Sequence, residues 1–130
     1  MSKSSSRIFF LFAAVAFIFV GCSQDADDAS QPVHAYLEAL VSQDIDQISN
    51  LVCTAWEEQA ILEVDAFMGV DAALEDVSCT QTEADEDSAL VECKGKIVAT
   101  YNVEQQELPL DGRFYVVTRE GGEWRVCGYP

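Results

Sequence analysis

The chain has 130 residues, a length that suits one domain. It carries 23 acidic and 7 basic residues, which gives a formal net charge of −16. A charge of this sign repels phosphate backbones, so the composition argues against nucleic acid as a partner.

The N-terminus changes from basic to apolar and then to acidic within its first 31 residues. Lys3 and Arg7 precede the run IFFLFAAVAFIFV at 8–20, which has the length of a signal-peptide core and is short for a permanent membrane span. Gly21 and Cys22 follow, and they resemble the most restrictive positions of a bacterial lipobox. The resemblance implies that 1–21 is a lipoprotein signal peptide.

By the same resemblance, Cys22 becomes the first residue of the mature chain and carries the lipid, including palmitate. The protein would then be held on the extracytoplasmic face of the cell membrane, or at an outer membrane where one is present. Two alternatives stay open: an ordinary signal peptide with Cys22 in a disulfide, and an uncut anchor.

Residues 22–31 are predicted to form a flexible acidic tether, because SQDADDASQ at 23–31 has no apolar periodicity. The three aspartates in it lack the glycine and the distal glutamate of an EF-hand calcium loop. No two cysteines of the chain stand in C-x-x-C spacing. The sequence therefore predicts no metal site and no cofactor. The folded domain is expected over 32–130.

Helical periodicity begins at Pro32, a residue that favours the first turn of a helix. The apolar positions that follow at spacings of three and four are Val33, Tyr36, Leu37, Leu40 and Val41. Asp44 with Gln47 three residues later resembles a capping box and predicts a second helix.

Thr54 with Glu57 forms a similar pair and predicts a third helix that starts there. Gly69 is expected to end it. The stretch 70–76 fits either a short helix or a lead-in to a sheet.

From Val77 onward the apolar period changes to two, which indicates strands. The strand candidates are 77–82, 89–94, 96–103, 112–119 and 124–129. The turn EGGE at 120–123 joins the last two and places Val117 opposite Val126. Both faces of this pair are partly apolar, as expected when helices cover one face and the other surrounds a cavity or meets a partner. A dimer through the sheet face is one such arrangement.

Four cysteines remain besides Cys22, and an even number in an exported chain suggests disulfides. A hairpin centred at Glu86 places Cys79 opposite Cys93, with Cβ atoms about 4.5–5.5 Å apart. This pairing leaves Cys53 for Cys127.

The order of helices first and antiparallel strands afterwards predicts an α+β fold. With YLEALVSQDIDQISNL at 36–51 and GGEWRVCGY at 121–129, this order resembles the nuclear transport factor 2-like superfamily, the cystatin-like α+β roll. The resemblance covers 32–130. It implies N-terminal helices packed on a curved antiparallel sheet, in a cone whose mouth often holds a ligand pocket. More narrowly, the chain resembles small bacterial lipoproteins with such a domain and no assigned activity.

Four aromatic residues are candidates for lining this pocket: Tyr36, Trp56, Tyr115 and Trp124. Each of them also suits an ordinary core position.

No catalytic residue is predicted. Tyr36 and Asp44 match the first helix of ketosteroid isomerases in spacing, but those enzymes add carboxyl groups inside the pocket. The region 53–67 departs from their pattern. His34 is the only histidine and has no Ser or Cys partner at an informative spacing.

The sequence thus predicts a lipid-anchored extracytoplasmic domain that binds an envelope protein or a small apolar ligand without catalysis. The alternative is an isomerase or cyclase-like enzyme that uses an apolar cone pocket. An open cavity lined by Tyr36 and at least one buried carboxyl would favour the enzyme. A cone filled by aromatic side chains would exclude it.

Overall fold

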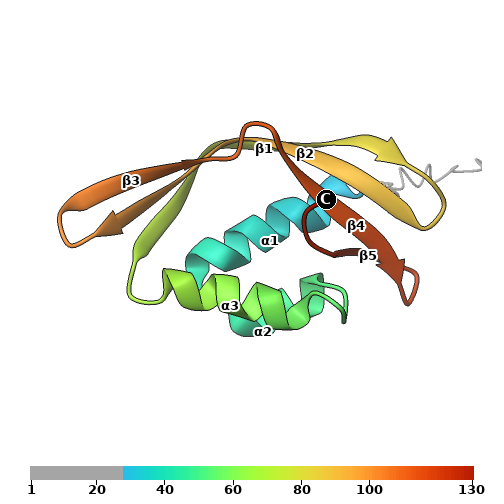
Figure 1. Cartoon of the computed structure of the whole chain (residues 1–130), viewed down its shortest axis with the longest axis horizontal. Coiled ribbons are helices and arrows are strands. Elements are labelled where there is room, and N and C mark those ends of the chain that lie inside the picture. The colour runs from blue at the N-terminus through green and yellow to red at the C-terminus, as the bar shows by residue number, and fades with distance from the viewer. Residues whose placement is uncertain (1–27) are drawn as a thin grey trace, which may run out of the picture.

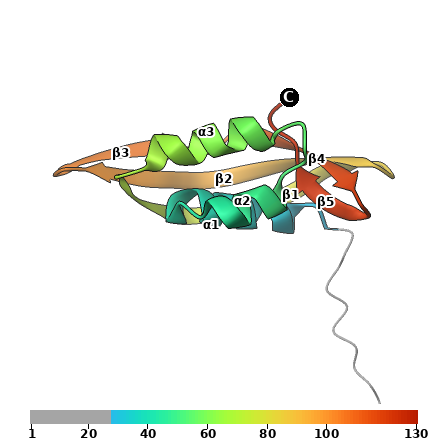
Figure 2. The same cartoon turned by 90° about the horizontal axis from the view of Figure 1, so that it is seen from below.

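A curved antiparallel sheet arches over three helices in residues 28–130, the part of the chain that this computed structural model describes (Figure 1). The expected signal peptide and Cys22 lie outside the described residues. The helices are α1 (Ser30–Ser42), α2 (Ile45–Leu51) and α3 (Glu57–Phe67). The strands are β1 (Asp71–Ala84), β2 (Ser88–Tyr101), β3 (Glu104–Pro109), β4 (Arg113–Glu120) and β5 (Glu123–Val126). All three helices lie on the concave face of the sheet (Figure 2).

The long strand β2 organises the sheet. β1 pairs along one side of it, while β4 and β3 share the other side, β4 against the first half of β2 and β3 against the second. Gly95 lies between these halves with φ +98°, a backbone conformation that favours glycine. The sheet changes partner at this point. The second half of β2 and the first half of β1, which pairs with it, extend away from β4 and β5 (Figure 1).

The core lies between α1 and the concave face of the sheet. Val33, Tyr36 and Leu37 of α1 are fully buried, and Val91 and Val117 meet them from the strands. Complete burial of one such aliphatic side chain contributes about 1.5–3 kcal/mol. The period of three and four in α1 and the period of two in the strands therefore bring two apolar surfaces together.

Several predicted elements are confirmed. The side chain of Asp44 caps α2 by accepting a hydrogen bond from the Gln47 amide at 3.0 Å. The chain leaves α3 at Phe67 and passes through Gly69, where φ is +77°. Val117 lies opposite Val126 in the last hairpin.

Other elements differ from the prediction. α1 begins at Ser30, and the amide of the buried Ala29 already donates to the Gln81 side chain, so the packed chain starts before 32. Of the two alternatives for 70–76, the lead-in to the sheet is confirmed, since β1 starts at Asp71. A bulge follows Glu75, where the register of β1 against β2 shifts.

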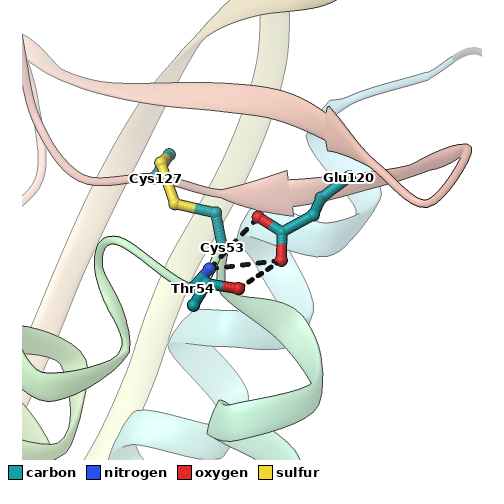
Figure 3. The surroundings of a disulfide bond; sticks show 4 residues. All are labelled: Cys53, Thr54, Glu120 and Cys127. Carbon is teal, nitrogen blue, oxygen red and sulfur yellow. Dashed lines mark hydrogen bonds between the residues drawn. A yellow bond between two sulfur atoms is a disulfide. The ribbon is translucent and has the colours of Figure 1, made fainter.

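The capping box at Thr54 is wrong. α3 begins at Glu57, and the Thr54 amide and hydroxyl donate instead to the carboxylate of Glu120, at 3.2 Å and 2.6 Å to the nearest oxygen (Figure 3). This contact ties the start of α3 to the end of β4.

The strand boundaries near the middle of the sheet also differ. The candidates 89–94 and 96–103 are one continuous strand, β2, and the polar strand β3 was not predicted. β5 ends at Val126, three residues earlier than expected. Within residues 28–130, no helix combines the length and the apolar character needed to cross a bilayer.

Candidate functional site

A cavity of about 730 Å³ opens between the C-terminal half of α3 and the part of the sheet where β2, β3 and β4 meet. Its volume lies within the range of small-molecule sites. Leu40, Ile97 and Leu108 form aliphatic walls from α1, β2 and β3. Leu108 is 39% exposed, so this apolar wall continues to the surface.

The carboxylate of Glu63, on α3, faces this cavity. The Tyr36 hydroxyl donates to Glu63 Oε2 at 2.6 Å. The Tyr129 hydroxyl lies 3.0 Å from Oε1 and 2.9 Å from Oε2. One carboxylate therefore joins α1, α3 and the C-terminal segment.

Aromatic rings surround this carboxylate on the side of the core. The ring of Tyr115 lies 5.2 Å from that of Tyr129 and 6.3 Å from that of Tyr36, and Trp56 meets Tyr129 edge-on at 5.6 Å. The guanidinium of Arg113 lies 5.6 Å from the Tyr129 ring centroid, at the rim of the cavity. The hydroxyl of Tyr115 is buried and has no hydrogen-bond partner among the described residues.

Burial keeps these tyrosines in their neutral form. It raises the pKa of Tyr36, and the hydrogen bond and negative charge of Glu63 raise it further. The pKa of Tyr129 is raised first by burial and then by the charge of Glu63. Burial also raises the pKa of Tyr115 against the opposing effect of Arg113. The two tyrosines that contact Glu63 therefore remain hydrogen-bond donors.

The C-terminal segment that carries Tyr129 is held from three directions. Cys127 forms a disulfide with Cys53, in the loop between α2 and α3 (Figure 3). The Gly128 carbonyl accepts from the amide of Val116 at 2.8 Å. Gly128 has φ +100°, and a Cβ atom there would lie 2.8 Å from the Trp56 ring, so only glycine permits this close approach.

Both disulfides expected from the sequence are present. Cys79 pairs with Cys93 across β1 and β2, where the two residues are direct register partners, and Cys53 pairs with Cys127.

The lining of the cavity contains none of the four aromatic residues expected to line a pocket. Tyr36 and Tyr115 are buried behind Tyr129, and Trp56 packs on the other side of that ring. Trp124 is 9% exposed and lies beneath the guanidinium of Arg119 at 4.1 Å, next to a separate hollow near the β1–β2 hairpin. Direct ligand contact by these four residues stays a prediction.

Glu63 was missed, although the sequence contains a signal for it. It lies three residues after Ala60 and four before Phe67, on the stripe of α3 that also carries the buried Val64. A single carboxylate on an apolar stripe either points into solvent or accepts hydrogen bonds from donors inside the fold. His34, by contrast, is a half-buried residue of α1 whose Nδ1 atom lies 3.5 Å from Glu38 Oε1.

No His, Cys, Asp or Glu side chains in the described part of the chain gather in a group of three or more that could hold a metal ion. No protein-family model matches the chain, and no curated protein matches it by sequence.

Solved structures do match its fold. A putative dehydratase of the nuclear transport factor 2-like family from Streptomyces avermitilis has a TM-score of 0.53 and 15% identity, over 81% of this chain and 94% of that one. A nuclear transport factor 2-like protein with a cystatin-like fold from Novosphingobium aromaticivorans also has a TM-score of 0.53 and 15% identity, over 78% and 77%. The fold is the nuclear transport factor 2-like roll.

The roll also resembles a SEC-C motif containing protein from Rhodopseudomonas palustris, with a TM-score of 0.55, 11% identity, and coverage of 81% and 79%. These descriptions differ from one another, and a shared fold does not imply a shared activity. The cavity, and not the shared fold, therefore carries the information on function.

Proposed function

We propose that this protein is a lipid-anchored extracytoplasmic domain that binds a small, largely apolar molecule in the cavity beside α3, without transforming it. The cavity itself carries the proposal. It has aliphatic walls, and a limited number of polar groups converge on it from Glu63, Asp111 and Arg113. This composition is typical of small-molecule sites.

The anchoring part of the proposal depends on the sequence. The apolar run at 8–20 and the pair Gly21-Cys22 support a lipoprotein signal. Two disulfides among the described residues agree with export, because disulfides persist in oxidising compartments.

A dye experiment tests the cavity. N-phenyl-1-naphthylamine, a neutral apolar dye, should bind purified residues 28–130 with increased fluorescence. Ala66→Trp should abolish this signal, because Ala66 lines the cavity and the indole would occupy part of the space that the dye needs. Gln59→Trp is the matched control, since Gln59 is an exposed residue of the same helix outside the lining. Equal dye binding by both variants would refute the site.

A second candidate, proton transfer on a small carbonyl compound, is favoured by one observation, the carboxylate of Glu63 at the cavity. An isomerase needs a base and a separate donor for the developing oxyanion. Here the hydroxyls of Tyr36 and Tyr129 are both directed at Glu63, so the donors are engaged by the base itself. We therefore place binding first.

The enzyme candidate has its own test. A β,γ-unsaturated cyclic ketone would be incubated with the protein, and its conversion to the conjugated isomer followed by ultraviolet absorbance. Turnover that Glu63→Gln removes would establish catalysis. A rate equal to that of buffer would exclude this reaction.

A further inference from the structure

The charge pattern of the cavity narrows the class of ligand. Two carboxylates, from Glu63 and Asp111, line it together with one guanidinium, that of Arg113. The chain as a whole carries 23 acidic against 7 basic residues. A field of this sign raises the local concentration of cations and lowers that of anions.

The carboxylate of Glu63 has only neutral donors. Its oxygens accept from Tyr36 and Tyr129, and among residues 28–130 it forms no salt bridge. Arg113 lines the same cavity and attracts Glu63 through its charge, but the two side chains form no salt bridge. The Glu63 carboxylate therefore has no direct ionic contact among the described residues. A positive group on the ligand would supply that contact.

Aromatic side chains in the lining also favour a positively charged ligand. Phe67 and Tyr129 both line the cavity, and ring faces attract cations. The Tyr129 ring already has a guanidinium 5.6 Å from its centroid, that of Arg113. Arg113 itself is exposed. Its guanidinium competes with a cationic ligand for the Tyr129 ring. It also repels any positive charge that a ligand places near Glu63.

We propose that the cavity takes a small organic monocation, a primary amine or quaternary ammonium on an apolar body. Glu63 and the Tyr129 ring hold the charge, while Leu40, Ile97 and Leu108 contact the body. This inference rests on the proposed binding function of the same cavity, and it names the ligand class that the function left open.

Three water-soluble probes of matched shape test the charge preference: benzyltrimethylammonium, benzyl alcohol and benzoate. Titration calorimetry uses the full chain in lipid nanodiscs, with empty nanodiscs as the blank. The ammonium compound should bind about tenfold more tightly than the alcohol, and benzoate should bind most weakly. Equal affinities, or tightest binding of benzoate, would overturn the charge preference.

Two substitutions with opposite expected effects test the roles of Glu63 and Arg113 in binding. Glu63→Gln should weaken the ammonium probe about tenfold, whereas Arg113→Gln should strengthen it because a competing cation is removed. Glu58→Gln, an exposed position on the same helix outside the lining, is the charge-matched control and should change nothing. Weaker ammonium binding by Arg113→Gln would overturn the inference even if Glu63→Gln fails to fold.

The same titrations separate this inference from the proposed function. If all three probes bind equally and Ala66→Trp abolishes them, the cavity binds ligands and the charge preference is wrong. If none binds, or if Ala66→Trp changes nothing, the binding function is wrong as well.

Discussion

At the scale of single residues, the cluster around Glu63 links stability to the protonation of tyrosines. Three of the four tyrosines, Tyr36, Tyr115 and Tyr129, have a raised pKa in the folded chain, with burial as the first cause. The folded state therefore holds these protons more tightly than the unfolded chain does. By linkage, stability from this source is complete below about pH 10 and falls as the pH rises above that value.

An alkaline titration tests this link between tyrosine protonation and stability. The ultraviolet absorbance of tyrosinate and the far-ultraviolet circular dichroism would be followed together as the pH rises. We expect the three tyrosines with a raised pKa to ionise only as the fold is lost. Ionisation of all four tyrosines near pH 10 with an unchanged dichroism spectrum would contradict the buried cluster.

Residue roles were the hardest feature to predict from the sequence. The spacing of apolar residues identified Tyr36 as a buried aromatic, but only the fold brings it to Glu63, 27 residues away. Thr54 looked like a helix cap because the local pattern fits one. Its donors are taken by Glu120, 66 residues later, and no local rule contains that partner.

At the scale of elements, Gly95 is the position at which the sheet changes partner. A side chain there would lie against the backbone carbonyl of Asp76, in the bulge of β1. Gly112 has a comparable positive φ of +77°, but the space around it is open. Alanine substitutions at these two glycines therefore distinguish the cost of backbone strain from the cost of steric overlap.

Gly95→Ala should lower the free energy of unfolding by more than about 2 kcal/mol, because strain and overlap add. Gly112→Ala should cost about 1 kcal/mol, from strain alone. Urea denaturation of both variants and the parent measures the difference. Equal losses of stability would show that the bulge of β1 adjusts to a side chain at position 95 at little cost. Glycine would then not be required where the sheet changes partner.

The second element-scale feature is the C-terminal segment, which brings Tyr129 to the cavity. The disulfide Cys53–Cys127 closes a separation of 74 residues, and Cys79–Cys93 one of 14. In the loop-entropy model these bridges contribute about 4 and about 3 kcal/mol. Only the first one holds the C-terminal segment that carries Tyr129.

Removing Cys53–Cys127 with a double alanine variant should therefore weaken dye binding as well as stability, because Tyr129 loses its tether. The matched variant without Cys79–Cys93 should lose stability and keep the dye affinity, measured at a temperature where both remain folded. Unchanged dye affinity without Cys53–Cys127, with weaker binding without Cys79–Cys93, would contradict this. The C-terminal segment would then be held by its backbone hydrogen bonds and not by the disulfide.

Element types could be predicted where apolar residues recur with the period of a helix or of a strand. α1 and the hairpin of β4 and β5 follow this rule, and so does the register of Cys79 against Cys93. β3 could not be found in this way, since all six of its residues are exposed and mostly polar. Its pairing depends on the backbone edge that the second half of β2 leaves open.

At the scale of the whole molecule, the start of the fold and the cavity lie at different ends of the sheet. The Ala29 amide is bound to Gln81, near the β1–β2 hairpin, whereas the cavity reaches Leu108 of β3 (Figure 1). Seven residues separate Cys22 from Ser30, so the two Cα atoms can be at most about 29 Å apart. A lipid on Cys22 would therefore hold the hairpin end close to the bilayer and leave the cavity facing the aqueous compartment.

Cys22→Ala tests this anchoring. The parent chain should partition into the detergent phase of a phase-separating detergent and incorporate an alkyne analogue of palmitate. The variant should either leave the membrane or remain unprocessed, because the acceptor sulfur is absent. The variant without Cys53–Cys127 is the control, since it loses two cysteines but keeps Gly21-Cys22 and should still be labelled. A processed Cys22→Ala chain that stays in the membrane would refute the lipid anchor, and the orientation argued from it would no longer hold.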